Sequence, residues 1–373
     1  MHRTRTLFAS MMGAAVLQLP LGVSGPAIPD QNLLTAQKVA LGRQLFFDNR
    51  LSADGTVSCA TCHDPQKGFA DGRPVAVGVK NQTGARNSPT VLYSGFADVQ
   101  FWDGRAATLE EQAKQPVIDP VEMGQPSHAA VVKAVTAAPD YGEAFGAAFG
   151  SPAVTIERIV QAIASFERTL APFSSSFDRF LTGQRDAISD GAKRGFVLFQ
   201  GKARCVTCHQ FSNSLPYFTD NRFHNIGVAM KGDFESLVRE AQSIVTTGGE
   251  TERAALAHKP GFEALGRWIV TQQPKDIGAF KTPTLRNVAL TAPYMHDGSQ
   301  ATLEAVMDFY NQGGEPNSNL DGAIRPLNLT KQELADVIEW MRSLTDEDGG
   351  QNFDWDQLKQ FARKTRAGEI VAR

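Results

Sequence analysis

The clearest helical pattern lies near the middle of the chain, between Thr155 and Leu170. Its apolar side chains recur every three or four residues, a spacing that puts them on one face of an α-helix: Ile156, Ile159, Val160, Ile163 and Phe166. Pro172 follows and cannot continue a helix. The pattern therefore predicts an amphipathic helix that buries one stripe and ends before this proline.

Two more helices are predicted where the sequence Thr-Leu-Glu occurs, at residues 108–110 and 302–304. A threonine can cap the first turn of a helix, and an acidic residue in that turn is favoured by the helix dipole. We therefore expect both threonines to be N-caps.

Polar stretches divide the rest of the chain. Residues 174–191 form a Ser-rich crossing, which we interpret as the boundary between two domains. Residues 227–275 carry a Gly-Gly pair and mixed charge, which indicates a long insertion that covers part of the fold. Residues 349–373 are predicted to be a polar tail with a terminal helix around Trp355.

The composition is that of an ordinary globular protein. The 373 residues include 37 Lys+Arg and 40 Asp+Glu, with 42% hydrophobic and 21% charged residues. At about 150 residues per domain, this length predicts roughly two domains. The near-neutral charge, without a block of Lys or Arg, argues against nucleic acid as a partner.

The N-terminus has the pattern of a targeting segment. Arg3 and Arg5 precede an apolar run from Leu7 to Val23, which Gln18 and Pro20 interrupt. The alternative is an uncleaved membrane anchor, but a spanning helix needs about 20 uninterrupted apolar residues. We therefore predict a signal peptide within residues 1–25, export to the periplasm, and a soluble mature protein.

All four cysteines belong to two copies of the motif C-x-x-C-H, formed by Cys59, Cys62 and His63 and by Cys205, Cys208 and His209. This motif is the attachment signature of c-type haem, in which two thiols bind the porphyrin and the adjacent histidine binds the iron. Zinc and disulfides are the alternatives. However, paired zinc motifs usually lie about 15–20 residues apart, and four cysteines are too few for a disulfide scaffold. The sequence therefore predicts two covalent haems.

The two haem motifs lie in an internal repeat. Gly-x-x-Leu-Phe precedes each of them, at residues 42–46 and 195–199. After each motif, residues 89–110 match residues 283–304 at a constant offset without a gap. Such self-similarity indicates repeated structure. We therefore predict a mainly α-helical fold of two cytochrome c-like domains, related by internal duplication and carrying one haem each.

The repeat also aligns one position of the first half with one of the second, and we expect this position to lie over the haem face opposite the iron-binding histidine. Pro116 in the first half corresponds to Tyr310 in the second. Proline has no group that binds iron, so the first haem is predicted to be open, whereas tyrosinate is a known haem ligand. Met307 is the rival ligand, because it lies three residues earlier on the same helical face. In a third reading, Tyr310 and Met307 only pack in the core.

An open haem that cleaves peroxide needs a side chain that moves a proton between the two oxygens. No histidine occurs between His63 and His128, so a carboxylate is the natural candidate. Glu122 follows Pro116 closely, and Gln112 could donate a hydrogen bond to an iron-bound oxygen. Without this context, either residue would be read as a solvated surface side chain. We predict that Glu122 is the acid/base.

The chain resembles the bacterial di-haem cytochrome c peroxidase and MauG family over residues 31–348. The matching segments are Phe-Trp-Asp-Gly-Arg at 101–105, Asp-Pro-Val-Glu-Met at 119–123, Thr-Pro-Thr-Leu-Arg-Asn at 282–287 and Pro-Tyr-Met-His-Asp-Gly at 293–298. The resemblance implies a peroxidatic haem in the N-terminal domain and an electron-transfer haem in the C-terminal domain.

The resemblance also implies roles for single residues. Gln112, Pro116 and Glu122 match the family's distal pocket, and Trp102 matches the tryptophan that carries electrons or holes between the haems. A calcium site between the domains is implied by Asn87 and by the backbone carbonyls of Thr291 and Pro293. Oxygen ligands of this kind suit a hard cation.

The chain departs from the family pattern at three places. The loop Val77–Gln82 lacks the histidine that must leave the iron in reductively activated peroxidases, so the first haem is predicted to be open as isolated. Tyr310 matches the MauG branch, whereas the usual peroxidase has methionine there. Ala203 stands where MauG has a tryptophan, which puts the MauG route for exporting holes in doubt.

We therefore predict a periplasmic di-haem peroxidase that reduces hydrogen peroxide with electrons from a small cytochrome c or a cupredoxin. One alternative is a MauG-like enzyme that oxidises side chains of a partner protein through a shared high-valent state. The other is a non-catalytic di-haem electron-transfer cytochrome. The sequence leaves a homodimer open. The predicted division of the chain is 1–25 (signal peptide), 31–180 (peroxidatic domain), 185–348 (electron-transfer domain) and 349–373 (tail).

Overall fold

The computed structural model describes residues 22–347, apart from residues 213, 231–233 and 260. The predicted signal peptide lies outside the described residues except for 22–25, and the predicted tail at 349–373 lies wholly outside them. Within the described part, no helix combines the length and the apolar character that crossing a bilayer requires.

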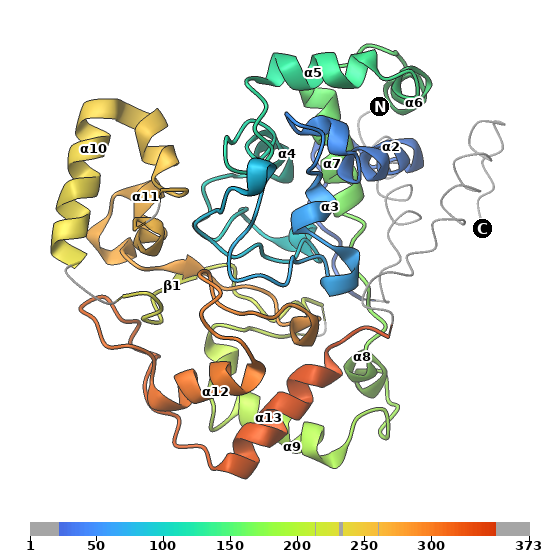
Figure 1. Cartoon of the computed structure of the whole chain (residues 1–373). Helices are drawn as coiled ribbons and strands as arrows, with labels where there is room; N and C mark the ends of the chain where they lie inside the picture. Colours follow the sequence, from blue (N-terminus) through green and yellow to red (C-terminus); the bar gives the residue numbers. More distant parts are fainter. Residues whose placement is uncertain (1–21, 213, 231–233, 260, 348–373) are drawn as a thin grey trace, which may run out of the picture.

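The chain is mainly helical and forms two halves, one above the other in Figure 1, with a side lobe next to their junction. The helices of the upper half are α2 (Ala36–Phe46), α3 (Cys59–Cys62), α4 (Leu109–Lys114), α5 (His128–Ala137), α6 (Tyr141–Phe149) and α7 (Ile156–Glu167). Those of the lower half are α8 (Ser176–Leu181), α9 (Asp190–Gln200), α12 (Leu303–Gln312) and α13 (Lys331–Ser343). The side lobe holds α10 (Phe234–Ala255) and α11 (Trp268–Thr271).

Short elements complete the fold. The strands β1 (Phe223–His224) and β2 (Phe280–Lys281) pair antiparallel, with Phe223 opposite Lys281. The 3-10 turns are η1 (Asp30–Asn32), η2 (Asn49–Leu51), η3 (Pro65–Lys67), η4 (Val79–Asn81), η5 (Ser94–Phe96), η6 (Cys205–Thr207), η7 (Glu263–Leu265), η8 (Pro274–Asp276) and η9 (Val288–Leu290).

The helices predicted from periodicity and capping are confirmed. α7 carries the predicted apolar stripe, and Thr155 Oγ1 accepts a hydrogen bond from Arg158 N at 3.2 Å. Thr108 caps α4 and Thr302 caps α12 in the same way. The two helices differ in length, because α4 ends before Pro116 whereas α12 continues through Tyr310.

One packing arrangement occurs in both halves. α2 packs against α7 and α9 packs against α13, in the two most extensive contacts between helices. A Cβ on Gly42 would lie 1.8 Å from Ala162 O, and a Cβ on Gly195 would lie 2.0 Å from Asp336 O. The glycine of each Gly-x-x-Leu-Phe segment therefore permits a backbone approach that no other residue allows.

Replacing Gly195 with alanine should destabilise the holoprotein. The new methyl group would collide with the α13 backbone, and overpacking typically costs about 1–3 kcal/mol or more. We expect the free energy of unfolding to fall by about 2 kcal/mol in urea denaturation, despite the better helix propensity of alanine. G142A in α6 is the control, because a Cβ there meets nothing within 4 Å. Equal stability of both variants would contradict the packing argument.

Separate hydrophobic clusters lie in the two halves. The first runs from Leu34 to Ala171 and also takes in Tyr217, and the second runs from Phe177 to Leu344. The ring of Phe177 lies 5.9 Å from that of Trp340. The chain therefore leaves the first cluster after Ala171 and enters the second at Phe177, because α8 packs with the second half. This point lies a few residues before the predicted domain limits at 180 and 185.

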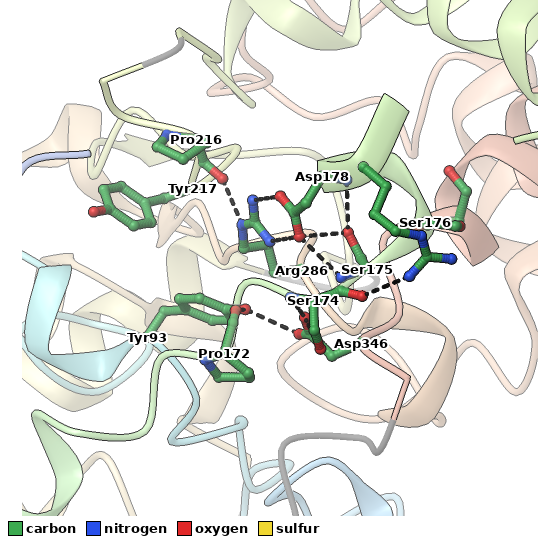
Figure 2. A network of polar contacts seen from close by, with 12 residues as sticks. Tyr93, Pro172, Ser174, Ser175, Ser176, Asp178, Pro216, Tyr217, Arg286 and Asp346 are labelled. Carbon is green, nitrogen blue, oxygen red and sulfur yellow. Dashed lines mark hydrogen bonds and ion pairs between the residues drawn. The ribbon is translucent and has the colours of Figure 1, made fainter. Parts of the chain in front are cut away.

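A polar network joins the two halves at this crossing (Figure 2). Tyr93 Oη lies 3.1 Å from Asp346 Oδ2, and Ser174 N donates to Asp346 Oδ1 at 2.6 Å. The buried Arg286 donates twice to Asp178, at 2.6 and 3.0 Å. Burial raises the pKa of Asp346. These contacts connect the upper half, the crossing and the end of α13, so they hold the halves in one relative position.

Candidate haem sites

The residues predicted for the first haem line one cavity of about 160 Å³. They come from α3, from α4 and from the turn after it, and are Cys59, Cys62, His63, Gln112, Pro116 and Glu122. The first half of the chain therefore brings together two thiols, an imidazole, an amide and a carboxylate around one space.

The second cavity, of about 300 Å³, lies in the other half and is lined by Cys205, Cys208 and His209. Both rival ligands, Met307 and Tyr310, also line it, so the geometry does not choose between them. Burial raises the pKa of Tyr310. Its phenol would have to release a proton to bind iron as tyrosinate.

Both histidines of the C-x-x-C-H motifs are oriented by backbone carbonyls. His63 Nδ1 lies 3.2 Å from Phe69 O, and His209 Nδ1 lies 2.9 Å from Phe218 O. Because a carbonyl only accepts, Nδ1 carries the proton and the lone pair of Nε2 remains for a metal. Burial lowers the pKa of His63 to about 4, which keeps the ring neutral. Both sites fit the haem that their sequence motifs predict.

The zinc and disulfide readings find no support. No disulfide bond joins the four cysteines in this structure. Among the described residues, two groups could share one metal ion, and the only cysteine in either is Cys208, which lies with Asp220 and His224. Neither C-x-x-C pair therefore forms the four-ligand cluster of a structural zinc site.

Asp119 and the loop Val77–Gln82 hold the turn that carries Glu122. Asp119 Oδ1 accepts hydrogen bonds from Val121 N at 2.8 Å and from Glu122 N at 3.2 Å. Val79 N donates to Glu122 O at 2.8 Å. A Cβ on Gly78 would lie 2.1 Å from Val121 O, so the loop packs directly on this turn. The histidine-free loop thus positions the backbone of Glu122.

The carboxyl group of Glu122 is poised to exchange a proton near neutral pH. Burial and the nearby Asp119 raise its pKa to about 7, against the opposing charge of Arg105. The side chain is 27% exposed, and it lines the cavity. A carboxylic acid with such a pKa at a cavity wall is suited to acid/base chemistry.

Trp102 lines both cavities. Its Nε1 donates to Asn87 O at 2.9 Å, and its carbonyl oxygen accepts a hydrogen bond from Lys281 N on β2, also at 2.9 Å. Trp102 is therefore held at the wall of both candidate haem sites, through its indole by the first half and through its backbone by the second.

A buried charge network follows Trp102. Asp103 is fully buried and accepts hydrogen bonds from Arg86 at 2.6 Å and from Arg105 at 3.1 Å. Burial would raise the pKa of Asp103, but the two arginines lower it to about 2. Arg267 of the side lobe donates to Asp103 O at 3.0 Å. The network fixes the loop between Trp102 and α4 and attaches the side lobe to it.

The three residues predicted for calcium line the second cavity, and Asn87 also lines the first. Asn87 comes from the first half, whereas Thr291 and Pro293 come from the second. Asn87 Nδ2 donates to Arg73 O at 2.8 Å, which leaves the amide oxygen as its ligand atom. The three residues thus lie on the wall of one cavity, and the calcium site stays a prediction from the sequence.

Two residues on the wall of the first cavity had no predicted role. His258 lines this cavity from the side lobe. Glu167 of α7 also lines it, and burial raises its pKa to about 8. No pattern in the sequence joins either residue to Glu122, because the cavity forms only when distant segments pack.

The comparisons with known proteins agree with this geometry. A family model described as di-haem cytochrome c peroxidase matches residues 36–186. The methylamine utilization protein MauG of Methylorubrum extorquens is 39% identical over 317 residues, which cover 85% of this chain and 80% of that protein. The cytochrome-c peroxidase IdrP1 of a Pseudomonas species is 36% identical over 325 residues, covering 85% and 83%.

A solved structure shares the whole architecture. It is the crystal structure of a MauG-like protein associated with microbial copper homeostasis, with a TM-score of 0.76, 33% sequence identity, and coverage of 90% of this chain and 97% of that one. Membership of this family implies two haem cofactors, which matches the two cavities. The chain therefore belongs to the di-haem cytochrome c peroxidase family and is an enzyme of the peroxidase type.

Proposed function

We propose that the protein is a periplasmic di-haem peroxidase that reduces hydrogen peroxide to water with electrons from a small cytochrome c or a cupredoxin. The observation that carries this proposal is the position of Glu122. It lines the same cavity as Cys59, Cys62 and His63, and its pKa is raised to about 7. A bound haem would supply iron for peroxide at the first site and for electron transfer at the second.

The side chains of the first site have separate tasks. Cys59 and Cys62 would attach the haem, and His63 would bind the iron through Nε2. Pro116 offers no iron ligand, so the iron would stay accessible to peroxide. Glu122 would take the proton of the inner peroxide oxygen and return it to the outer one, which leaves as water.

Gln112 would donate a hydrogen bond to the bound oxygen from the wall of the same cavity. The reduction of one peroxide to two waters consumes two electrons and two protons in all. The protons pass through the first site, and the donor protein supplies the electrons.

The second site would store and pass on electrons. Cys205 and Cys208 would attach its haem, and His209 and Tyr310 would bind its iron. Trp102 would connect the two sites, which is supported by its place on both cavity walls. A calcium ion at Asn87, Thr291 and Pro293 would hold the two halves together around that connection.

We also infer that the two halves arose by internal duplication. The repeated glycine contact, at Gly42 in the first half and Gly195 in the second, supports this origin. Export to the periplasm is supported by the basic and apolar pattern of residues 1–25 and by the haem-attachment motifs, because bacteria attach c-type haem outside the cytoplasm.

A MauG-like activity on side chains of a partner protein is the second candidate. Tyr310 favours it, and so does the similarity to a protein named MauG. Ala203 argues against it, because a buried alanine cannot replace a tryptophan as a carrier of holes. A purely electron-transferring role fits less well, because Pro116 provides no second ligand for the first iron.

A turnover assay tests the proposed function. Purified holoprotein is mixed with peroxide and either reduced small cytochrome c or reduced cupredoxin, and donor oxidation is followed by absorbance. We expect two donor molecules to be oxidised for each peroxide consumed. If neither donor is oxidised with this stoichiometry, while a partner protein is modified, the MauG-like candidate replaces the peroxidase.

The peroxide reaction should depend on pH through Glu122. Because its pKa is raised to about 7, the carboxyl group is protonated below that pH and cannot accept the peroxide proton. We expect the second-order rate constant to rise about tenfold per pH unit below pH 7 and to level off above it. Stopped-flow measurements between pH 5 and 9 would check this profile, and a flat profile would count against Glu122.

A further inference from the structure

His258 brings the side lobe to the acid/base of the first site. It follows α10 and lines the first cavity together with Glu122. Its Nδ1 lies 3.4 Å from Asp119 Oδ2 and 3.7 Å from Glu122 Oε1. The imidazole therefore faces both carboxyl groups of the turn that carries Glu122.

Arg105 determines which nitrogen of His258 carries the proton. Arg105 Nη2 lies 3.1 Å from His258 Nε2. A guanidinium group only donates hydrogen bonds, so Nε2 accepts and the proton of the neutral ring is on Nδ1. Burial and the positive charge of Arg105 also lower the pKa of His258, which keeps the ring neutral. The N–H group of the imidazole is thus directed to the carboxyl groups.

The segment that carries His258 is anchored on both sides. Leu256 and Ala257, which directly precede His258, are buried in a small hydrophobic cluster of the side lobe. After it, Glu263 O accepts a hydrogen bond from Arg86 at 3.1 Å, and Arg267 donates to the loop that carries Arg105. The position of the imidazole therefore follows from the docking of the lobe.

We propose that His258 is a positioning residue: its Nδ1–H group, held in place by Arg105, faces the Asp119 and Glu122 pair at 3.4 and 3.7 Å and favours the ionised carboxylate of Glu122. This inference rests on the proposed function, because His258 acts through Glu122. The adjacent Asp119 raises the pKa of Glu122, and an N–H dipole directed at the ionised carboxylate opposes that effect. Without the donor, Glu122 stays protonated to higher pH and accepts the peroxide proton less often.

The other charged groups around His258 come from three segments. They are Arg86, Asp103 and Arg105 of the buried network and Asp119 and Glu122 of the turn. The two arginines lower the pKa of Asp103 to about 2. Asp103 therefore stays ionised between pH 5 and 9 and does not account for a shift in the titration of Glu122.

The test uses cyanide binding to the ferric holoprotein at equilibrium, followed by the absorbance of the first haem. Cyanide binds iron as the anion, and the proton of hydrogen cyanide passes to the distal base. The pH dependence of the dissociation constant therefore reports the ionisation of Glu122 without turnover. H258L removes both ring nitrogens, whereas H258Q keeps a donor and an acceptor. H128Q is the matched control, because His128 contacts Lys114 O at 2.9 Å and does not line the cavity.

We expect the pH midpoint of cyanide binding in H258L to lie about one unit above that of the wild type. The midpoints of H258Q and H128Q should stay near the wild-type value. If H258L does not incorporate both haems, H258A takes its place with the same expectation.

Two outcomes overturn the proposal. The first is that the pH midpoint of cyanide binding is the same in H258L as in the wild type. The second is that the midpoint shifts as far in H258Q as in H258L. A different outcome separates the proposed function from this inference. If the wild type shows no midpoint and E122Q binds cyanide like the wild type, the role of Glu122 fails, whatever His258 does.

Discussion

Replacing Glu122 with glutamine is expected to slow the reaction with peroxide by about 100-fold to 10,000-fold, the usual contribution of a positioned acid/base. Glutamine has nearly the same shape, but it cannot accept a proton from peroxide. The turn around it should keep its structure, because Asp119 and Val79 contact the backbone of Glu122, which the substitution leaves in place. Both haems should therefore remain bound, and the measurement is the stopped-flow rate constant at pH 8.

The matched control is E157Q. Glu157 lies in the first turn of α7, is exposed, and does not line the cavity. The same chemical change at this position should leave the rate within a factor of two. The account of the first site would be wrong if E122Q reacted as fast as E157Q with full haem content.

Replacing Tyr310 with methionine is expected to raise the reduction potential of the second haem by on the order of 100 mV, within the range of about 0.8 V that axial ligands span. An anionic oxygen ligand stabilises oxidised iron, whereas methionine raises the potential. The methionine side chain is unbranched and can adapt to the apolar wall of the cavity. A spectroelectrochemical titration of the ferric and ferrous forms measures the change directly.

The substitution M307L tests whether Met307, rather than Tyr310, binds the iron of the second haem. Met307 is 3% exposed and belongs to the second hydrophobic cluster, so leucine should fill nearly the same volume. If Tyr310 binds the iron, M307L keeps the wild-type potential. A shift in M307L together with an unchanged potential in Y310M would assign the ligand to Met307 and move the protein away from the MauG-like branch.

Local signals in the sequence predicted much of this molecule. The haem motifs need only neighbouring residues, and the threonine caps of α4 and α12 act on the next turn, so both could be read without tertiary information. The internal repeat added the comparison of Pro116 with Tyr310. The haem-motif residues, Pro116 and Tyr310 each line one of the two cavities.

Features that depend on distant packing could not be predicted. His258 reaches Glu122 only because Arg86 and Arg267 dock the side lobe on the buried charge network. The change between the two cores at α8 likewise depends on the contact of Phe177 with the second half. Periodicity identifies the buried face of a helix, but it does not identify the partner of that face.

The choice between Met307 and Tyr310 shows a second limit. Residues three positions apart share one helical face, and both line the second cavity. Their spacing does not separate them, because a thioether and a phenol can both line an apolar wall. Only the chemistry of the bound iron distinguishes the two ligands.

The central claim is that the first site is open to peroxide without prior reduction. Rapid mixing of the fully ferric holoprotein with one equivalent of peroxide, followed through the absorption of both haems, tests it most directly. The account predicts an immediate change at the first haem, and a simultaneous change at the second if Trp102 connects them. If no spectrum changes until one haem has been reduced, the open-site claim based on Pro116 and the histidine-free loop is wrong, and the protein is a reductively activated peroxidase.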